Sequence, residues 1–323
     1  MKIVHLVLSN VFAGIEQHVN ELTLEQQFQE DVVIICNEEI SKEFDLKNVI
    51  TINNFNRRSP LGIIKLLFLI KKINSDILHT HGSKTTSVIN IIKKFIKVNH
   101  VATLHGIKNN TNPYKKANKV IAVSGSAQKS LDIESEVIKN WWSPNLPNYI
   151  DNKKEYALAI GRLEKVKGFD LLIESWVGVE SSLIIVGSGK EYKNLSNLIK
   201  LHSLENKISI VDDVPFGELI EYYSNASILI VSSRNEGGPR VALEALRLKV
   251  PVISTDVGHM KEILPVELLA VPDDLNSLKE LVHRYVGNES MNQDSIYKYV
   301  TEEYSIKAQS KKVHQVYKDL LVS

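Results

Sequence analysis

Short apolar runs alternate with longer amphipathic segments along the whole chain. The runs are five to seven residues long and rich in Val and Ile, which is typical of strands buried on both faces of a sheet. They occupy residues 2–8, 31–36, 48–52, 76–82, 100–106, 119–124, 155–161, 181–187, 207–212, 228–233, 250–255 and 267–272. Helical patterns such as 168–179, 193–204 and 276–286 fill the gaps. Strands alternating with helices predict parallel sheets built from right-handed βαβ units.

A break separates the first six predicted strands from the last six. Residues 141–155 carry Pro144, Pro147 and several Asn and Asp residues, as an interdomain linker does. A chain of 323 residues is also longer than one hydrophobic core usually grows. We therefore predict an α/β fold of two Rossmann-like domains facing across a central cleft, with residues 1–151 in the first and 152–307 in the second. Ligands of such sheets bind outside the carboxyl ends of the strands.

Composition narrows the class of protein. With 43% hydrophobic and 24% charged residues, the chain is unlike disordered, collagenous or disulfide-rich proteins. The one cysteine, Cys36, favours a reducing compartment, and the N-terminus lacks the pattern of a signal peptide. The longest apolar stretch, residues 61–73, is interrupted by Lys65 and is too short to span a bilayer. We expect a cytoplasmic protein.

Charge is distributed unevenly, although the net charge is only +1. Residues 51–119 hold 13 Lys and Arg against the single acid Asp76, a local charge of +12, so the remainder carries −11. A helix is predicted after Ser59, with Leu61, Ile64, Leu67 and Phe68 on one stripe flanked by lysines; residues 89–100 form a second basic, apolar segment.

Two interpretations of residues 57–97 follow from this charge. Basic amphipathic helices are typical of membrane-surface elements, so an anionic membrane is a candidate partner. The alternative is that the apolar faces pack on the sheet and the lysines are only solvated. Nucleic acid is not expected, because no aromatic residues interleave regularly with the lysines.

Polar residues collect where the predicted strands of the first half end. His79, His81 and His105 all fall there, and imidazoles suit hydrogen bonding to hydroxyls or phosphates and acid–base chemistry near neutral pH. A structural role is the alternative for any one of them. No Cys or carboxylate cluster accompanies them, so no metal is expected. Gly14, before a predicted helix, would let a ligand approach the backbone closely.

The second half opens with a cationic loop. Arg162, Lys165 and Lys167 follow the strand that ends at Gly161, and three cations within six residues can receive a phosphate group. A solvated basic loop is the alternative. Gly187 and Gly189 form an incomplete G-x-G-x-x-G pattern, which argues against binding of a nicotinamide dinucleotide.

The stretch "EGGPRVALEAL", residues 236–246, follows a strand and begins a helix. Pro239 is expected in the first helical turn, and the amides around Gly237, Gly238 and Arg240 then form an anion pocket at the positive end of the helix dipole. Glu236 and Glu244 are suited to accept hydrogen bonds from hydroxyls of a sugar and of a ribose. Together these parts suit a sugar nucleotide. A solvated helix face is the alternative for Glu244.

Taken in order, "AGIEQHV", "DILHTHG", "VATLHG", "IGRLEKVKGFDLLIESW" and "EGGPRVALEALRLKVPVISTDVGHMKEIL" resemble the retaining GT-B glycosyltransferases of family 4 across nearly the full chain. The last contains the E-x7-E element of that family. The chain departs from the family pattern at Ala13, at His259 and in the Gly-Gly-Pro turn, which leaves the donor open.

The resemblance assigns roles to individual residues. Arg162 and Lys167 would hold the donor diphosphate, with Gly14 against it. Glu236 would bind the donor sugar and Glu244 the ribose. His105 would lie near the anomeric carbon. His79, His81 and Glu16 are acceptor-side candidates. A final helix, residues 308–323, would pack back on the first domain.

The implied activity is transfer of a sugar from a nucleotide-sugar donor, with a UDP-sugar preferred, to a glycan or lipid-linked saccharide in bacterial surface-polysaccharide or lipopolysaccharide synthesis. The anomeric configuration would be retained. No Asp-x-Asp motif occurs, so neither a divalent metal nor another cofactor is expected. By resemblance, the protein would attach peripherally to the inner face of the cytoplasmic membrane. Two alternatives stay open: a GT-B sugar-nucleotide epimerase or hydrolase, and a non-catalytic sugar-nucleotide-binding subunit.

Overall fold

The computed structural model describes residues 1–52, 59–147, 155–287 and 291–322. The chain divides into two compact units: Met1–Asn140 with Ile306–Ser323 (unit 1), and Trp141–Ser305 (unit 2). The division therefore follows Asn140, whereas the boundary predicted at residues 151 and 152 lies outside the described residues. Both units are parallel-sheet α/β domains of the Rossmann type, as predicted.

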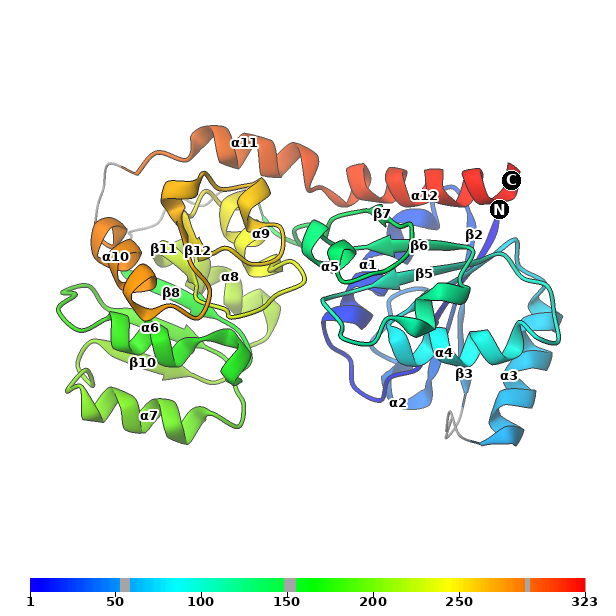
Figure 1. Cartoon of the computed structure of the whole chain (residues 1–323), viewed down its shortest axis with the longest axis horizontal. Coiled ribbons are helices and arrows are strands. Elements are labelled where there is room, and N and C mark those ends of the chain that lie inside the picture. Colours follow the sequence, from blue (N-terminus) through cyan, green and yellow to red (C-terminus); the bar gives the residue numbers. More distant parts are fainter. Residues whose placement is uncertain (53–58, 148–154, 288–290, 323) are drawn as a thin grey trace. The chain divides into compact units, whose positions relative to one another are not determined.

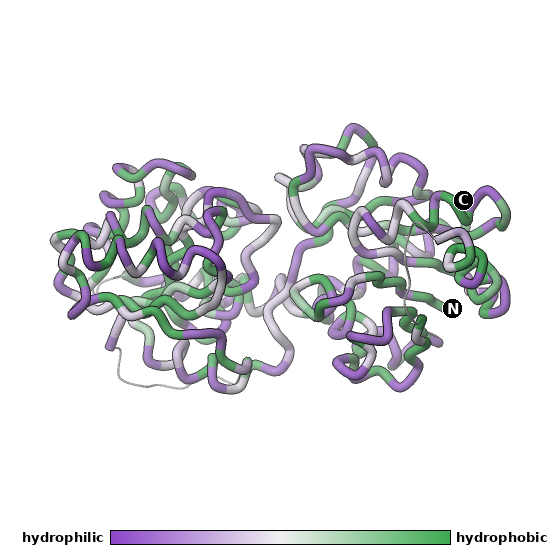
Figure 2. The backbone as a smooth tube through the Cα atoms, turned by 90° about the horizontal axis from the view of Figure 1, so that it is seen from below, coloured by the Kyte–Doolittle hydropathy of each residue, from purple (hydrophilic) through white to green (hydrophobic). Residues whose placement is uncertain are grey.

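Unit 1 is built on a seven-stranded parallel sheet in the order β3-β2-β1-β4-β5-β6-β7. Its strands are β1 Lys2–Val7, β2 Asp31–Asn37, β3 Val49–Ile52, β4 Ile77–His81, β5 His100–Leu104, β6 Lys119–Ala122 and β7 Glu136–Val137. The first six coincide with the predicted runs. The apolar pattern missed β7, because a two-residue strand at a sheet edge has no run to detect. Figure 2 shows hydrophobic and hydrophilic stretches alternating along the backbone.

The helices of unit 1 cover this sheet (Figure 1). They are α1 Gly14–Gln26, α2 Glu38–Ser41, α3 Pro60–Ile73, α4 Ser83–Ile92, α5 Gly125–Lys129, α12 Ile306–Val322 and the 3-10 helix η1 Asn112–Lys116. Helix α3 begins where predicted, because the Ser59 hydroxyl accepts from the Gly62 amide at 3.3 Å. Helix α12 packs beside α1, and its Tyr317 reaches the buried side chains of the sheet.

Unit 2 contains a six-stranded parallel sheet in the order β10-β9-β8-β11-β12-β13. Its strands are β8 Tyr156–Ile160, β9 Leu183–Val186, β10 Ile208–Val211, β11 Ala226–Val231, β12 Val252–Thr255 and β13 Leu269–Ala270. Its helices are α6 Phe169–Ser175, α7 Tyr192–Leu201, α8 Phe216–Asn225, α9 Arg240–Arg247, α10 Leu275–Tyr285, α11 Asp294–Glu303, η2 Lys165–Lys167, η3 Met260–Glu262 and η4 Val266–Leu268. The loops after β8 and β11 meet at one edge because these strands are neighbours.

No helix in the described part of the chain combines the length and the apolar character needed to cross a bilayer.

Candidate functional site

In unit 2, the loops after β8 and β11 bring together two charged residues that are far apart in sequence. The ammonium group of Lys167 in η2 forms an ion pair with Oε1 of Glu236, which directly precedes the Gly-Gly-Pro turn. The Ser233 hydroxyl donates to the same carboxylate oxygen at 3.0 Å. Both charged side chains keep about a fifth of their surface exposed, 21% for Lys167 and 17% for Glu236. A ligand could therefore reach both.

Two glycines hold the backbone of this site in place. Gly168 has φ +67°, and a Cβ there would lie 2.0 Å from the carbonyl oxygen of Ser232. Gly258, with φ +59°, packs against the turn so that its Cβ would lie 2.9 Å from the Cα of Gly238. Only glycine allows these approaches without strain. The loops after β8, β11 and β12 are thus fastened together around Lys167 and Glu236.

Arg234 fastens the same loops through its side chain, and the sequence patterns did not reveal it. Its guanidinium donates to both carboxylate oxygens of Asp170, at 2.7 and 2.8 Å, and to the Lys165 carbonyl at 2.7 Å. It also contacts Asp273. Burial alone would raise the pKa of Asp170, but the hydrogen bonds and charge of Arg234 lower it. The only sequence signal for this role of Arg234 is its position in a strand-end loop. Its acidic partners lie too far away in the sequence to be inferred.

Helix α9 carries the second glutamate of the motif. Glu244 is nearly buried, at 6% exposed, so the solvated-face alternative does not hold. Its Oε2 accepts from the Tyr223 hydroxyl at 2.9 Å, and its Oε1 lies 4.0 Å from the guanidinium of Arg240. Burial, followed by the charge of Glu244, raises the pKa of Tyr223 well above its usual range. Tyr223 was not predicted to take part.

The turn and the cationic loop differ in detail from the expectation. Pro239 is the N-cap with φ −69°, and α9 begins one residue later, at Arg240. Gly237 and Gly238 precede it in the turn. Arg162 has its side chain 71% exposed and donates to Glu164 at 2.9 Å, and Lys165 is also exposed. Of these three cations, Lys167 is the one that contacts Glu236.

Unit 1 has a cavity of about 650 Å³ at the carboxyl ends of β1, β4 and β5. Its polar lining includes Ser9, Glu16, His81, Ser83, His105 and Tyr114. Glu16 is buried, and its two oxygens accept from the Ser9 hydroxyl at 2.6 Å and from the Ala13 amide at 3.0 Å. It therefore also holds the start of α1. Gly14 is the first residue of α1, and a Cβ at this position would meet no atom within 4 Å.

The predicted histidines of unit 1 lie together but are not equivalent. His81 and His105 line the cavity and share a hydrogen bond at 3.1 Å between Nδ1 and Nε2, respectively. His79 is fully buried, away from the cavity lining, and bonds to the Tyr317 hydroxyl at 2.6 Å and to the Thr103 hydroxyl at 2.7 Å. The sequence pattern could not distinguish His79 from the two cavity histidines, because a strand buried on both faces encloses the side chains on either side of the sheet.

His5 and His18 extend this group and were missed by the sequence reasoning. His5 is enclosed in the middle of β1, and its ring nitrogens contact His81 at 3.0 Å and Gln26 at 2.8 Å. His18 on α1 places its ring edge-on to that of His105, with centroids 4.7 Å apart.

Burial lowers the pKa of four of these imidazoles, those of His5, His79, His81 and His105. It brings the pKa of His5 to about 4 and that of His105 to about 3, and it lowers the pKa of His79 and of His81 well below 6.5. The four rings are therefore neutral at pH 7.

Two histidine groups have ring nitrogens close enough to share a metal ion. Within the described residues they are His5, His79 and His81, and His18, His81 and His105, with atoms within 4.8 Å of one another. In the first group, nitrogens of all three rings already make hydrogen bonds, which a metal would have to displace. The absence of a metal stays a prediction.

Comparisons with known proteins give the class. A model of glycosyl transferases group 1 matches residues 147–298, and a model of glycosyltransferase family 4 matches residues 12–133. The chain is a GT-B glycosyltransferase of the family 4 type. An uncharacterized glycosyltransferase of Methanocaldococcus jannaschii is 26% identical over 308 residues, covering 86% of each chain. An O-antigen chain mannosyltransferase of Salmonella typhimurium is 28% identical over 167 residues, covering 50% of this chain and 47% of that protein.

The fold of this glycosyltransferase matches solved GT-B structures. HepE of Anabaena in complex with UDP superposes with a TM-score of 0.86, covering 99% of this chain and 100% of HepE, at 16% sequence identity. The predicted fold class is confirmed by this likeness.

Proposed function

We propose that this glycosyltransferase binds a nucleotide-sugar, with UDP as its nucleotide, on the strand-end loops of unit 2. The observation that carries the proposal is the pairing of Lys167 with Glu236 beside the start of α9. Both side chains are partly exposed. The Lys167 cation can bind the diphosphate of such a donor, and the Glu236 carboxylate can accept hydrogen bonds from its sugar hydroxyls. HepE of Anabaena forms complexes with UDP and with UDP-glucose, which supports the choice of UDP.

On binding, the donor would break the ion pair between Lys167 and Glu236 and form its own contacts with both residues. The diphosphate would take the Lys167 ammonium and the amides before α9, with Arg162 swinging in from the surface. Glu236, still held by Ser233, would then accept from sugar hydroxyls, and Glu244 would receive the ribose. The present contacts of both glutamates show acceptor oxygens already oriented by neighbouring donors.

The proposed reaction retains the anomeric configuration without a metal. The acceptor hydroxyl attacks the anomeric carbon from the face that the nucleotide leaves, and its proton passes to the departing diphosphate. Lys167 would stabilise the negative charge that develops there, which is commonly the largest catalytic term in such sites.

For the acceptor we propose a saccharide, free or lipid-linked, that binds in the unit 1 cavity beside His81, His105 and Glu16. Its volume of about 650 Å³ suits one or two sugar rings, and its lining offers hydroxyl, carboxylate and imidazole groups. The names of the Salmonella mannosyltransferase and of an amylovoran biosynthesis glycosyltransferase of Erwinia amylovora, 36% identical over 107 residues, support a surface polysaccharide or lipopolysaccharide as product.

A lipid-linked acceptor would fit a peripheral position on the inner face of the cytoplasmic membrane. Helix α3 turns Leu66 and Ile70 into the core but leaves Leu61, Ile64 and Phe68 exposed by 72%, 47% and 64%. The exposed trio shares one helical stripe, and Lys65 and Lys72 beside it are exposed too.

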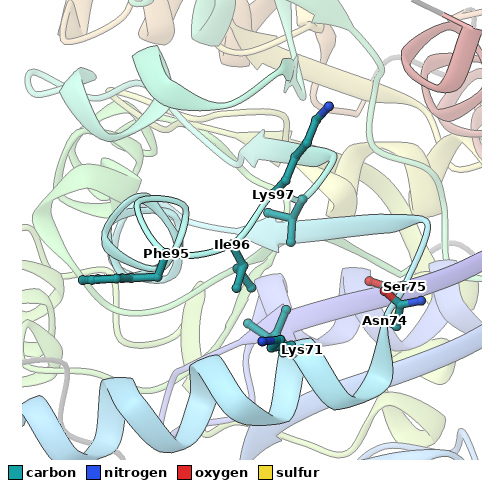
Figure 3. Close-up of a pocket in the computed structure, with 8 residues that line it drawn as sticks. Lys71, Asn74, Ser75, Phe95, Ile96 and Lys97 are labelled. Carbon is teal, nitrogen blue, oxygen red and sulfur yellow. The ribbon is translucent and has the colours of Figure 1, made fainter.

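The segment after α4 adjoins α3 and adds to this basic, apolar surface. Figure 3 shows the pocket between them, with Lys71 and Asn74 on one side and Phe95 to Lys97 on the other. Phe95 is 69% exposed. Arg57 and Arg58, also part of the predicted basic segment, lie outside the described residues. Lysines beside exposed apolar side chains suit an anionic membrane, because the lysines attract the lipid headgroups and the apolar side chains enter the acyl region beneath them.

The transfer proposal is tested by replacing Lys167 with Ala. Turnover of a UDP-sugar with a saccharide acceptor should fall by about 100- to 1,000-fold, because the developing charge loses its cation. Lys200→Ala, an exposed lysine in the last turn of α7, is the matched control and should keep its turnover. Near-normal turnover of the Lys167 variant would contradict the charge-stabilising role. Release of UDP that is independent of any acceptor would instead indicate a hydrolase, and conversion of the UDP-sugar to its epimer without release of UDP would indicate an epimerase.

A further inference from the structure

The buried polar side chains of unit 1 form one continuous hydrogen-bonded chain. From the cavity inward it runs from His105 Nε2 to His81 Nδ1 at 3.1 Å, and from His81 Nε2 to His5 Nδ1 at 3.0 Å. It continues from His5 Nε2 to the Gln26 side-chain oxygen at 2.8 Å. The two nitrogens of each inner ring are thus both used, one toward each neighbour.

The chain continues on the other side of Gln26. The Gln26 amide nitrogen donates to the Tyr317 hydroxyl at 3.4 Å, and that hydroxyl contacts His79 Nδ1 at 2.6 Å. His79 Nε2 in turn meets the Thr103 hydroxyl at 2.7 Å. Tyr317 comes from α12, so the C-terminal helix completes the network.

Gln26 is the one member of this network whose two ends have fixed and opposite roles. An amide oxygen only accepts, an amide nitrogen only donates, and a neutral imidazole has one nitrogen of each kind. Since the Gln26 oxygen accepts, His5 must carry its proton on Nε2 and accept at Nδ1. His81 must then donate from Nε2 and accept at Nδ1, so His105 donates from Nε2.

The opposite branch follows the same rule. Tyr317 accepts from Gln26 and therefore donates to His79 Nδ1, which leaves the His79 proton on Nε2 for Thr103. Turning the Gln26 amide over would reverse every bond on both sides. The network therefore has two polarities, and the orientation of one side chain selects between them.

We propose that Gln26 is a positioning residue that fixes the tautomer of His105 through His5 and His81, so that His105 offers an unprotonated Nδ1 to a hydroxyl of a ligand in the unit 1 cavity. His105 lines that cavity, and its Nε2 is already engaged with His81. The other ring nitrogen is the one that a ligand would meet. The reverse polarity would present an N–H there and would favour an acceptor, such as a carbonyl or an anionic oxygen. Only the identity of the ligand rests on the proposed function.

The first test needs no variant and no ligand. In the full chain with 15N-labelled histidine, the two ring nitrogens of a neutral imidazole give distinct signals, one typical of N–H and one of a bare nitrogen. At pH 7, His105 should show its N–H signal at Nε2 and the bare signal at Nδ1, and so should His5 and His81. An N–H signal at Nδ1 of His105 would overturn the proposal, whether or not the protein proves to transfer sugars.

A variant separates the role of Gln26 from that of the surrounding packing. Gln26→Met keeps the length of the side chain but removes both the amide oxygen and the amide nitrogen, so the His105 signals should move toward the average of two tautomers. Gln27→Met makes the same change at the exposed neighbouring position and should leave them unmoved. A folded Gln26→Met protein with the wild-type His105 signals would show that something other than Gln26 sets the tautomer. If that variant does not fold, the wild-type measurement still decides the polarity.

Discussion

At the scale of single residues, burial keeps His5, His100 and His105 of unit 1 neutral at pH 7. The pKa is about 4 for His5 and about 3 for His100 and His105, against 6.5 for an exposed histidine. The cause in each case is loss of hydration, which disfavours the charged ring. The unfolded chain therefore binds more protons than the folded one at mildly acidic pH, and unit 1 should lose stability there.

We expect the loss to begin as the pH falls through 6.5 and to continue toward 4 and 3, since a depressed histidine pKa makes stability rise with pH in that window. Each such histidine lowers the free energy of unfolding by about 2 kcal/mol as the pH falls from 7 to 5. Pulsed hydrogen exchange of peptides from β1 and β4, across urea series at several pH values, measures this. His100→Gln removes one titrating ring and should flatten the slope. A pH-independent midpoint for these strands would show that the rings are not held neutral.

The sequence located the candidate site residues at the strand ends but could not rank them. Glu236, Lys167 and His105 fall where the strand-end argument put them. His79 obeys the same argument but is enclosed, and Gln26, Tyr317 and Arg234 act through partners that lie 21 to 291 positions away. No local pattern encodes such distances, because the topology of the sheet creates them.

At the scale of elements, α3 shows how one helix serves two environments. The helix has more apolar residues than one packing face can bury. Leu66 and Ile70 fill the core, whereas Leu61, Ile64 and Phe68 remain exposed. The prediction of a single apolar stripe was right about the exposed trio but also included Leu67, which is half-buried against the core. The packing interpretation therefore holds for the buried face of the helix, and the membrane interpretation stays a prediction for its exposed face.

The exposed face of α3 makes a prediction about membranes. The protein should float with liposomes that contain anionic phospholipid, more weakly at high salt, because the lysines contribute through screened charges. Phe68→Glu should reduce flotation, since it adds a negative charge and removes an apolar side chain. Phe28→Glu is the matched control, being an aromatic residue of unit 1 that is 80% exposed outside this surface, and should float normally. Equal flotation of the two variants, or no flotation of the wild type at low salt, would contradict membrane binding by this face of α3. The lysines would then be only solvated.

At the scale of the whole molecule, the alternation of apolar runs and helices was sufficient to predict two parallel α/β units. All twelve predicted strands are present, and one family model matches in each half of the chain. The short strand β7 escaped prediction, because its pairing depends on tertiary contacts. The division after Asn140 falls where the predicted linker, residues 141–155, begins.

We propose that unit 2 binds a UDP-sugar through Glu244 and the Lys167–Glu236 pair. The most direct test is thermal unfolding of the full chain against UDP-, GDP-, ADP- and CMP-sugars. A hundredfold excess over Kd should stabilise the binding unit by about 2.7 kcal/mol and raise its midpoint by roughly 5 to 10 °C. We predict this rise with UDP-sugars and its loss in Glu244→Gln, while Tyr223→Phe, which removes only the neighbouring hydroxyl, should retain most of it. No rise with any nucleotide-sugar would contradict the account.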